Sequence, residues 1–313
     1  MKFPDNHWAL ILGGSSGFGL ATARKLVRHG LNLCLVHRDR RGAMARIEPV
    51  FEELRAIGPK VLTFNADALD AAVRGEILAA LALELGARGR VRVLLHSIAF
   101  GNLKLVAAER PRPRPALPAL AAALRVDEEK LAAAVNELFA DGCDDLAGLA
   151  SPPEYSDKQF LDEEDFSRTI YSMGTSALTW TQDVLARGLF ADDARVFGLT
   201  SEGNTVAWKG YAAVAAAKVA LESVSRAMAV ELAPYGVRSN VIQAGVTDTP
   251  ALRAIPGGEH LKAQARLRNP FRRLTTPEDV ADVIYLLSLD EAAWVNGEVI
   301  RVDGGEHISG ATS

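Results

Sequence analysis

A glycine-rich turn near the start of the chain restricts the possible folds more than any other feature of this sequence. The apolar run Trp8–Leu12 leads into GGSSGFG at residues 13–19, and a helical pattern follows from Leu20 to Val27. A strand, a glycine turn and a helix in this order form the context in which a dinucleotide-binding loop occurs. Glycine lets the backbone approach a pyrophosphate, whose charge is stabilised by free N–H groups at the helix N-terminus. Tight turns without a ligand also use glycine, so this loop alone does not establish a nucleotide site.

Strands and helices alternate along the first hundred residues. Helical patterns at 42–57 and 69–85 separate the apolar runs Leu31–His37, Lys60–Phe64 and Val91–Leu95. Alternation at this spacing predicts a Rossmann-type α/β fold, a doubly wound parallel sheet with right-handed crossovers. We expect one domain over residues 1–313. Ligands of such sheets bind at the carboxyl ends of the strands, which would bring together Gly13, Arg38, Asp67 and Ser97.

The end of the second strand bears on the choice of nucleotide. An NAD site usually offers an acidic residue here, which binds the ribose 2′-hydroxyl. This strand ends instead on His37 and Arg38, with Arg41 close behind. A guanidinium pairs well with a 2′-phosphate, so the sequence favours NADP(H). Asp39 leaves NAD(H) as the alternative, and a solvated charge run at a helix start is the interpretation without a ligand.

Residues 102–162 interrupt the alternation. Alternating prolines in RPRPRPALP at 110–118 enforce extended backbone, and helical patterns follow at Leu117–Leu124 and Asp127–Phe139. Asp127 and Glu128 suit a helix N-terminus. We expect a small helical insertion at the mouth of the sheet. It would serve either as a lid or wall for a substrate, or as an oligomer contact or surface elaboration.

The second half of the chain resumes the alternation. We expect helices at 166–189, 211–232 and 278–287, strands at 195–200, 237–242 and 298–302, and a mobile, partly helical segment at 251–268. Thr276 is the expected N-cap of the helix that begins near Pro277.

Tyr211 and Lys218 lie seven residues apart in the expected helix that ends near Leu232. Seven residues are about two turns, so both side chains would share one face, with Val214 between them. A phenol and an ammonium in this arrangement suit proton or hydride chemistry, because the cation can bind a ribose and lower the pKa of the phenol. An interfacial tyrosine and a solvated lysine on an ordinary helix are the alternative.

Composition excludes several classes of protein. The chain has 313 residues, a formal charge of −4, 49% apolar residues and two cysteines, Cys34 and Cys143. Two cysteines build no disulfide framework or metal site, and the charge gives no whole-molecule signature of nucleic-acid binding. The sequence start lacks the long apolar segment of a signal peptide, and no apolar run approaches the ~20 residues of a membrane span. We expect a cytoplasmic protein with no metal.

Together these motifs resemble the short-chain dehydrogenase/reductase superfamily over almost the whole chain except roughly 102–162. Gly13, Gly17 and Gly19 fit its G-x3-G-x-G loop, although Leu12 replaces the usual threonine. The usual Y-x3-K spacing is absent, because Val214 occupies the tyrosine position. Tyr211 and Lys218 instead give the Y-x6-K pattern of the enoyl-acyl carrier protein reductase branch.

Three further segments resemble this superfamily. HSIAF at 96–100 resembles the H-S-I-G-F of the enoyl reductases, with Ala99 replacing glycine, and ALRAIPGGEHL at 251–261 is most similar to their NADPH-dependent bacterial variant. Residues 240–249 and VIRVDGG at 299–305 resemble the cofactor-side loop and the last strand. The resemblance implies cofactor contacts at Gly13, Ser15, Ser16, Gly17, Phe18, Gly19, His37, Arg38, Asp67, Ala68, Ser97, Ile98, Ala99, Thr200, Lys218, Ala244, Gly245, Thr247 and Thr249.

The reaction implied by the resemblance is reduction of the carbon–carbon double bond of an enoyl thioester, on acyl carrier protein or coenzyme A. Tyr211 would donate a hydrogen bond to the enolate oxygen, and Lys218 would bind the nicotinamide ribose. Ser201 would be a second oxyanion donor, or only a serine that ends a strand and caps a turn. A carbonyl or 3-oxoacyl reductase and a non-catalytic NADP(H) sensor are the alternatives. By analogy with the superfamily we expect a homo-oligomer, a tetramer or dimer.

Overall fold

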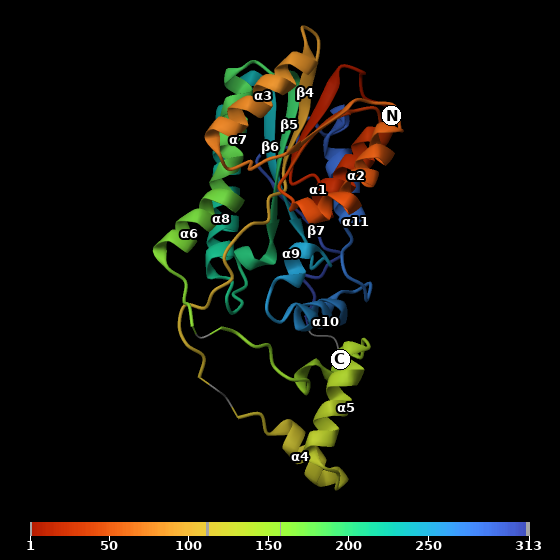
Figure 1. Cartoon of the computed structure of the whole chain (residues 1–313), viewed down its shortest axis with the longest axis vertical. Coiled ribbons are helices and arrows are strands. Elements are labelled where there is room, and N and C mark those ends of the chain that lie inside the picture. The colour runs from red at the N-terminus through yellow and green to blue at the C-terminus, as the bar shows by residue number, and fades with distance from the viewer. Residues whose placement is uncertain (1, 111–112, 157, 311–313) are drawn as a thin grey trace.

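The computed structural model describes residues 2–110, 113–156 and 158–310. A sheet of seven parallel strands lies at its centre, in the order β3-β2-β1-β4-β5-β6-β7 (Figure 1). The predicted Rossmann-type fold is therefore confirmed. The strands are β1 (His7–Leu12), β2 (Asn32–His37), β3 (Val61–Asn65), β4 (Arg90–His96), β5 (Phe190–Ser201), β6 (Val237–Ala244) and β7 (Val299–Val302).

Helices cover both faces of this sheet, because the strands are apolar on both sides. Leu10 and Leu12 of β1 pack toward one face, while Ala9 and Ile11 pack toward the other. One layer contains α3 (Ala71–Leu85), α7 (Ser176–Ala186) and α8 (Ala212–Glu231). The opposite layer contains α1 (Gly17–Arg28), α2 (Arg41–Arg55) and α11 (Pro277–Leu287) (Figure 1).

The strand order reverses between β1 and β4, which opens a crevice at their carboxyl ends. Leu12 of β1 pairs with His96 of β4, so the residues that follow these strands are neighbours. A Cβ atom on Gly13 would lie 2.3 Å from the carbonyl oxygen of Ser97, and the φ of Gly13 is +89°. Glycine is therefore required at this position by the fold itself, before any ligand is considered.

The helix expected over 166–189 is divided. It consists of α6 (Glu163–Ile170), a π-helical turn (Tyr171–Thr175) and α7, which ends before Gly188 at a φ of +64°. Single π-helical turns occur inside helices, frequently at functional sites. Other elements differ from expectation mainly at their ends, the largest difference being β5, which begins at Phe190 instead of Arg195. Thr276 caps α11 as expected, in a capping box with Asp279.

The insertion contains the two expected helices, α4 (Ala116–Leu124) and α5 (Glu128–Ala140), with Asp127 as the N-cap of α5. Pro111 and Arg112 of the proline-alternating run lie outside the described residues. Figure 1 shows this helical pair far from the sheet, on the outer side of α9 (Pro250–Arg253) and α10 (Gly258–Arg268).

An ion pair and a ring contact link the insertion to α10. Asp144 forms a two-bond ion pair with Arg266, with both N···O distances at 2.5 Å. The Phe139 ring lies against the His260 ring, with 4.8 Å between the ring centroids. The insertion therefore supports the segment 251–268, which was expected to be mobile.

Loss of the Asp144 charge tests this support. In Asp144→Asn, α10 loses its ion pair to the insertion, which at this half-buried site contributes about 1 kcal/mol. We expect amide hydrogen exchange in α10 to rise about fivefold, measured by mass spectrometry. Asp145→Asn is the matched control, because Asp145 is the exposed neighbour of Asp144. Equal exchange in α10 of the two variants would contradict the support.

Candidate active site

Two adjoining pockets form a groove along the carboxyl ends of the strands. The first pocket is lined by the glycine loop and by the ends of β2 and β3, and the second by the ends of β5 and β6 together with α8. They share Phe18, residues 97–99, Thr249 and Ala251. Every residue predicted for the cofactor or for catalysis lines one of these pockets, except Gly19. A Cβ atom on Gly19 would lie 2.1 Å from the carbonyl oxygen of Gly13, so this glycine allows α1 to pack against the loop.

The N-terminus of α1 points into the first pocket without an anionic partner of its own. Ser16 is the N-cap residue but its side chain makes no capping hydrogen bond, and the first turn contains no acidic residue. Ser15, Ser16 and Gly17 line the pocket here. Free N–H groups and the helix dipole favour a negative group at this point, as a dinucleotide pyrophosphate provides.

Arg38 and Asp67 face each other across the first pocket. Their side chains form an ion pair with an N···O distance of 2.7 Å, and the Arg38 guanidinium lies 4.5 Å from the centre of the Phe100 ring. Burial raises the pKa of Asp67, but the Leu69 N–H and the Arg38 guanidinium outweigh this effect and hold the pKa below its usual value. His37 lines the same pocket with its ring directed to Asp39, at 2.9 Å between Nδ1 and Oδ2.

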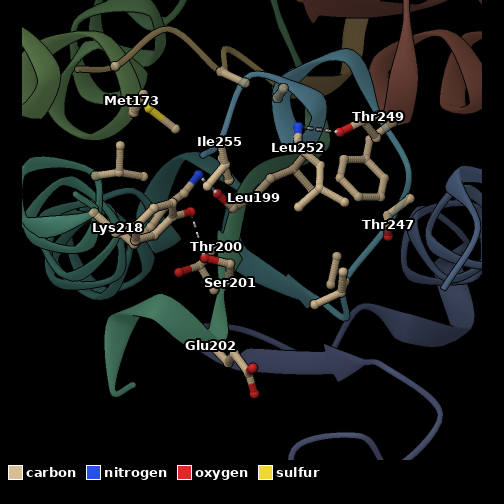
Figure 2. A pocket seen from close by; sticks show the side chains of 18 of the residues that line it. Met173, Leu199, Thr200, Ser201, Glu202, Lys218, Thr247, Thr249, Leu252 and Ile255 are labelled. Carbon is tan, nitrogen blue, oxygen red and sulfur yellow. Dashed lines mark hydrogen bonds between the residues drawn. The ribbon is translucent and has the colours of Figure 1, made fainter. Parts of the chain in front are cut away.

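Tyr211, Ser201 and Lys218 meet in the second pocket. The Tyr211 hydroxyl lies 3.4 Å from the Ser201 hydroxyl oxygen, and the Lys218 ammonium donates a 2.8 Å hydrogen bond to the Leu199 carbonyl oxygen (Figure 2). Tyr211 itself precedes the helix, since α8 begins at Ala212 and the backbone of Tyr211 is not helical. The expected helix start was therefore one residue early, although both side chains still line one pocket.

The pKa of Tyr211 differs from the expected one, while Lys218 is a buried amine with a lowered pKa. Burial lowers the pKa of Lys218 to about 8, partly offset by the Glu222 carboxylate. Burial also raises the pKa of Tyr211, and the hydrogen bond between Tyr211 and Ser201 offsets this only in part. The expected lowering of the phenol pKa by the lysine was wrong, because loss of solvation dominates for a buried phenol. Tyr211 is consequently a hydrogen-bond donor that stays protonated near neutral pH.

Glu222 is a residue of this site that the sequence reasoning missed. Its Oε1 atom accepts hydrogen bonds from the Thr200 hydroxyl at 2.6 Å and from the Asn204 amide at 2.7 Å. Glu222 lies four residues after Lys218 on α8, so the i, i+4 spacing was the available signal. The network fixes the end of β5 against α8, with the Thr200 hydroxyl turned to Glu222.

The threonines after β6 use their hydroxyl groups within the chain. The Thr247 hydroxyl donates to the Gly245 carbonyl oxygen at 2.9 Å, and the Thr249 hydroxyl caps α9 by accepting from the Leu252 N–H at 3.3 Å (Figure 2). Both residues line the second pocket.

The apolar wall of the second pocket comes from several segments of the chain. Leu252, Ile255 and Leu261 come from the segment 251–268. Met173 of the π-helical turn and Trp208 were not anticipated. Among the described residues of 102–162, Leu103 is the one that lines this pocket. The insertion thus reaches the pocket at Leu103, near its start, and otherwise supports the segment 251–268 from outside.

The described part of the chain contains neither a metal-binding cluster nor a membrane-spanning helix. No group of three or more His, Cys, Asp or Glu side chains among residues 2–110, 113–156 and 158–310 is arranged to hold a metal ion. Within the same ranges, no helix has the length and apolarity needed to cross a bilayer.

Known proteins similar to this chain include reductases and dehydrogenases. 1-Cyclohexenylcarbonyl-CoA reductase of Streptomyces collinus is 35% identical over 122 residues, which cover 38% of this chain and 44% of that protein. Cis-4-hydroxycyclohexanecarboxylate dehydrogenase of Sinomonas cyclohexanicum is 26% identical over 95% of each chain. The fold is similar to the crystal structure of Bacillus cereus enoyl-acyl carrier protein reductase with NADP+ and indole naphthyridinone, with a TM-score of 0.74, 21% identity, and coverage of 99% of this chain and 100% of that one.

Two family matches cover most of the sequence. Residues 7–112 match the short chain dehydrogenase family, and residues 126–307 match the family described as Enoyl-(Acyl carrier protein) reductase. The second match spans more than half of the chain and contains Ser201, Tyr211 and Lys218. The chain therefore belongs to the short-chain dehydrogenase/reductase superfamily, with an enoyl-(acyl carrier protein) reductase-type region from residue 126 to residue 307.

Proposed function

We propose that this protein reduces the carbon–carbon double bond of an enoyl thioester with NADPH. The observation that carries the proposal is the shared pocket of Tyr211, Lys218 and an apolar wall. A protonated phenol and a buried ammonium in one pocket suit an oxygen that becomes negative during the reaction. The apolar wall suits an acyl group. The family match over residues 126–307 and the similarity to the Streptomyces reductase agree with this reaction class.

The groove fits a dinucleotide, from the glycine loop to the ends of β5 and β6. The free N-terminus of α1 would bind the pyrophosphate, and Arg38 would bind the 2′-phosphate in exchange for its pairing with Asp67. Lys218 would donate hydrogen bonds to the nicotinamide ribose, while residues 244–249 would line the nicotinamide side. When bound, reduced nicotinamide would supply the hydride that the β-carbon of the enoyl group accepts, and a proton from water would complete the reduction at the α-carbon.

Tyr211 would act at the thioester oxygen. Its hydroxyl donates a hydrogen bond to the oxygen as enolate charge develops, an interaction that is strongest in the transition state. The raised pKa of Tyr211 keeps the proton on the phenol at neutral pH, as a donor requires. The Lys218 ammonium places a positive charge in the same pocket, which stabilises the enolate further.

A carbonyl reductase of the same superfamily is the second candidate. The 3.4 Å approach of the Ser201 and Tyr211 hydroxyl groups favours it, because two donors at one point can polarise a ketone oxygen. The full-length similarity to the Sinomonas dehydrogenase agrees with this alternative. The cytoplasmic location, the acyl carrier protein as substrate carrier and the homo-oligomer stay predictions.

The Tyr211→Phe variant tests the proposed chemistry. We expect kcat/KM for crotonyl-CoA with NADPH to fall by at least about 100-fold, because the variant loses one preorganised oxyanion donor. NADPH affinity should change less than about threefold, which separates chemistry from folding. Assays follow NADPH absorbance with crotonyl-CoA and acetoacetyl-CoA in parallel. Turnover of acetoacetyl-CoA alone by the wild type would support the carbonyl reductase, and full activity of Tyr211→Phe would rule out the proposed role.

The Arg38→Ala variant tests the cofactor. Loss of the guanidinium that would pair with a 2′-phosphate should weaken NADPH binding about 10-fold or more, since a charge-assisted pair is lost. NADH lacks this phosphate, so its dissociation constant should change less than about threefold and serves as the internal control. Both constants can be measured by the fluorescence of the bound nicotinamide. An equal loss for NADPH and NADH would argue against a 2′-phosphate site at Arg38.

A further inference from the structure

The second pocket adjoins a further cavity, called the outer cavity. That cavity is lined by Gln264, Ala265, Leu267 and Arg268 of the α10 region, and by four residues that also line the pocket. The shared residues are Glu202, Trp208, Val246 and Leu261. These four residues, called the partition below, separate the space beside Tyr211 from the outer cavity.

Trp208 is the largest member of the partition and is held beside the proposed oxyanion donor. Its ring meets the Tyr211 ring edge-on, with 5.4 Å between centroids. A Cβ atom on Gly203 would lie 3.2 Å from Trp208 Cζ3 and 2.5 Å from Tyr211 Cε1, so both rings pack closely over this glycine. Trp208 therefore has a fixed place at the inner end of the pocket, because two neighbours restrict its ring.

Glu202 is the charged residue of the partition, which also contains the indole ring of Trp208. Its Oε1 atom accepts a 2.6 Å hydrogen bond from Arg268, and the same guanidinium nitrogen contacts Glu306 at 3.0 Å. Glu202 and Glu306 are buried, and Figure 2 shows Glu202 on the far side of the pocket from Met173. An alkyl chain that continued in this direction would lie against a buried carboxylate, which is unfavourable because the chain offers it no hydrogen bond.

We propose that Trp208 limits the length of the acyl group and that the substrates of this protein are short-chain acyl thioesters. This inference rests on the proposed function, since it names the substrate class of the same pocket. Leu103, Met173 and Ile255 enclose the first carbons of the acyl chain. Trp208 and Glu202 form the end of the pocket and stop the acyl chain from extending further. A longer chain gains no further apolar contact until the indole is removed.

The test compares the binding of butyryl-CoA and decanoyl-CoA by isothermal titration calorimetry, with NADP+ present. Both ligands carry the same coenzyme A, so their affinity ratio reports the acyl pocket. The wild type should bind decanoyl-CoA no more tightly than butyryl-CoA. In Trp208→Ala, the ratio should shift toward decanoyl-CoA by at least about 10-fold, because each newly buried methylene contributes about fourfold in affinity. Trp208→Phe should give a smaller shift in the same direction, and it serves if the alanine variant does not fold.

Trp294→Ala is the matched control, because Trp294 is 97% exposed and lines none of these pockets. Its affinity ratio should equal that of the wild type. A wild type that binds decanoyl-CoA at least about 10-fold more tightly than butyryl-CoA would overturn the length limit. The length limit would also be overturned if both Trp208 variants kept the wild-type ratio of decanoyl-CoA to butyryl-CoA affinity. The same conclusion would follow if no variant bound either ligand. Turnover of crotonyl-CoA by the wild type decides the proposed function separately from this ratio.

Discussion

The buried ammonium of Lys218 is the interaction on which the rest of the site depends. A charged amine is costly to bury unless polar groups compensate for the lost water. Here the Leu199 carbonyl oxygen accepts a 2.8 Å hydrogen bond from it, and the Glu222 carboxylate favours its charged form. Both partners belong to elements that the parallel sheet fixes in place, β5 and α8. The position of the ammonium in the groove is therefore a consequence of the fold, and Tyr211 and Ser201 line the same pocket.

Much of this architecture could be predicted because its signals are local. Gly13 must be glycine because its backbone approaches the carbonyl oxygen of Ser97, which follows the neighbouring strand. Gly13 is also part of the glycine motif that predicts a nucleotide site. Alternating strands and helices specify a parallel sheet, and such a sheet gathers its strand ends at one edge. Tyr211 and Lys218 were found from their spacing, although the helix starts one residue later than expected.

The remainder depends on contacts between distant segments, which a single sequence does not display. Arg38 and Asp67 pair across 29 positions, and Asp144 and Arg266 across 122. Composition predicted the helices of the insertion, but nothing in it indicated that α5 and the residues after it would pack outside α10. The raised pKa of Tyr211 was missed for a related reason, since burial of a side chain is set by the whole fold. Trp208 and Met173 likewise lie in the pocket only because the chain folds back on itself.

The titration of Lys218 tests the central claim most directly. The pKa of about 8 means that the ammonium loses its proton as the pH rises through that value. If Lys218 binds the cofactor as a cation, NADPH affinity should fall about twofold between pH 7 and 8 and progressively more above pH 8. The 2′-phosphate of NADPH does not cause this loss, because it titrates lower, near pH 6. Tyr211→Phe should keep this dependence, and Lys218→Met should bind weakly at every pH without it. An affinity that does not change up to about pH 10 in the wild type, or a dependence that persists in Lys218→Met, would contradict the account.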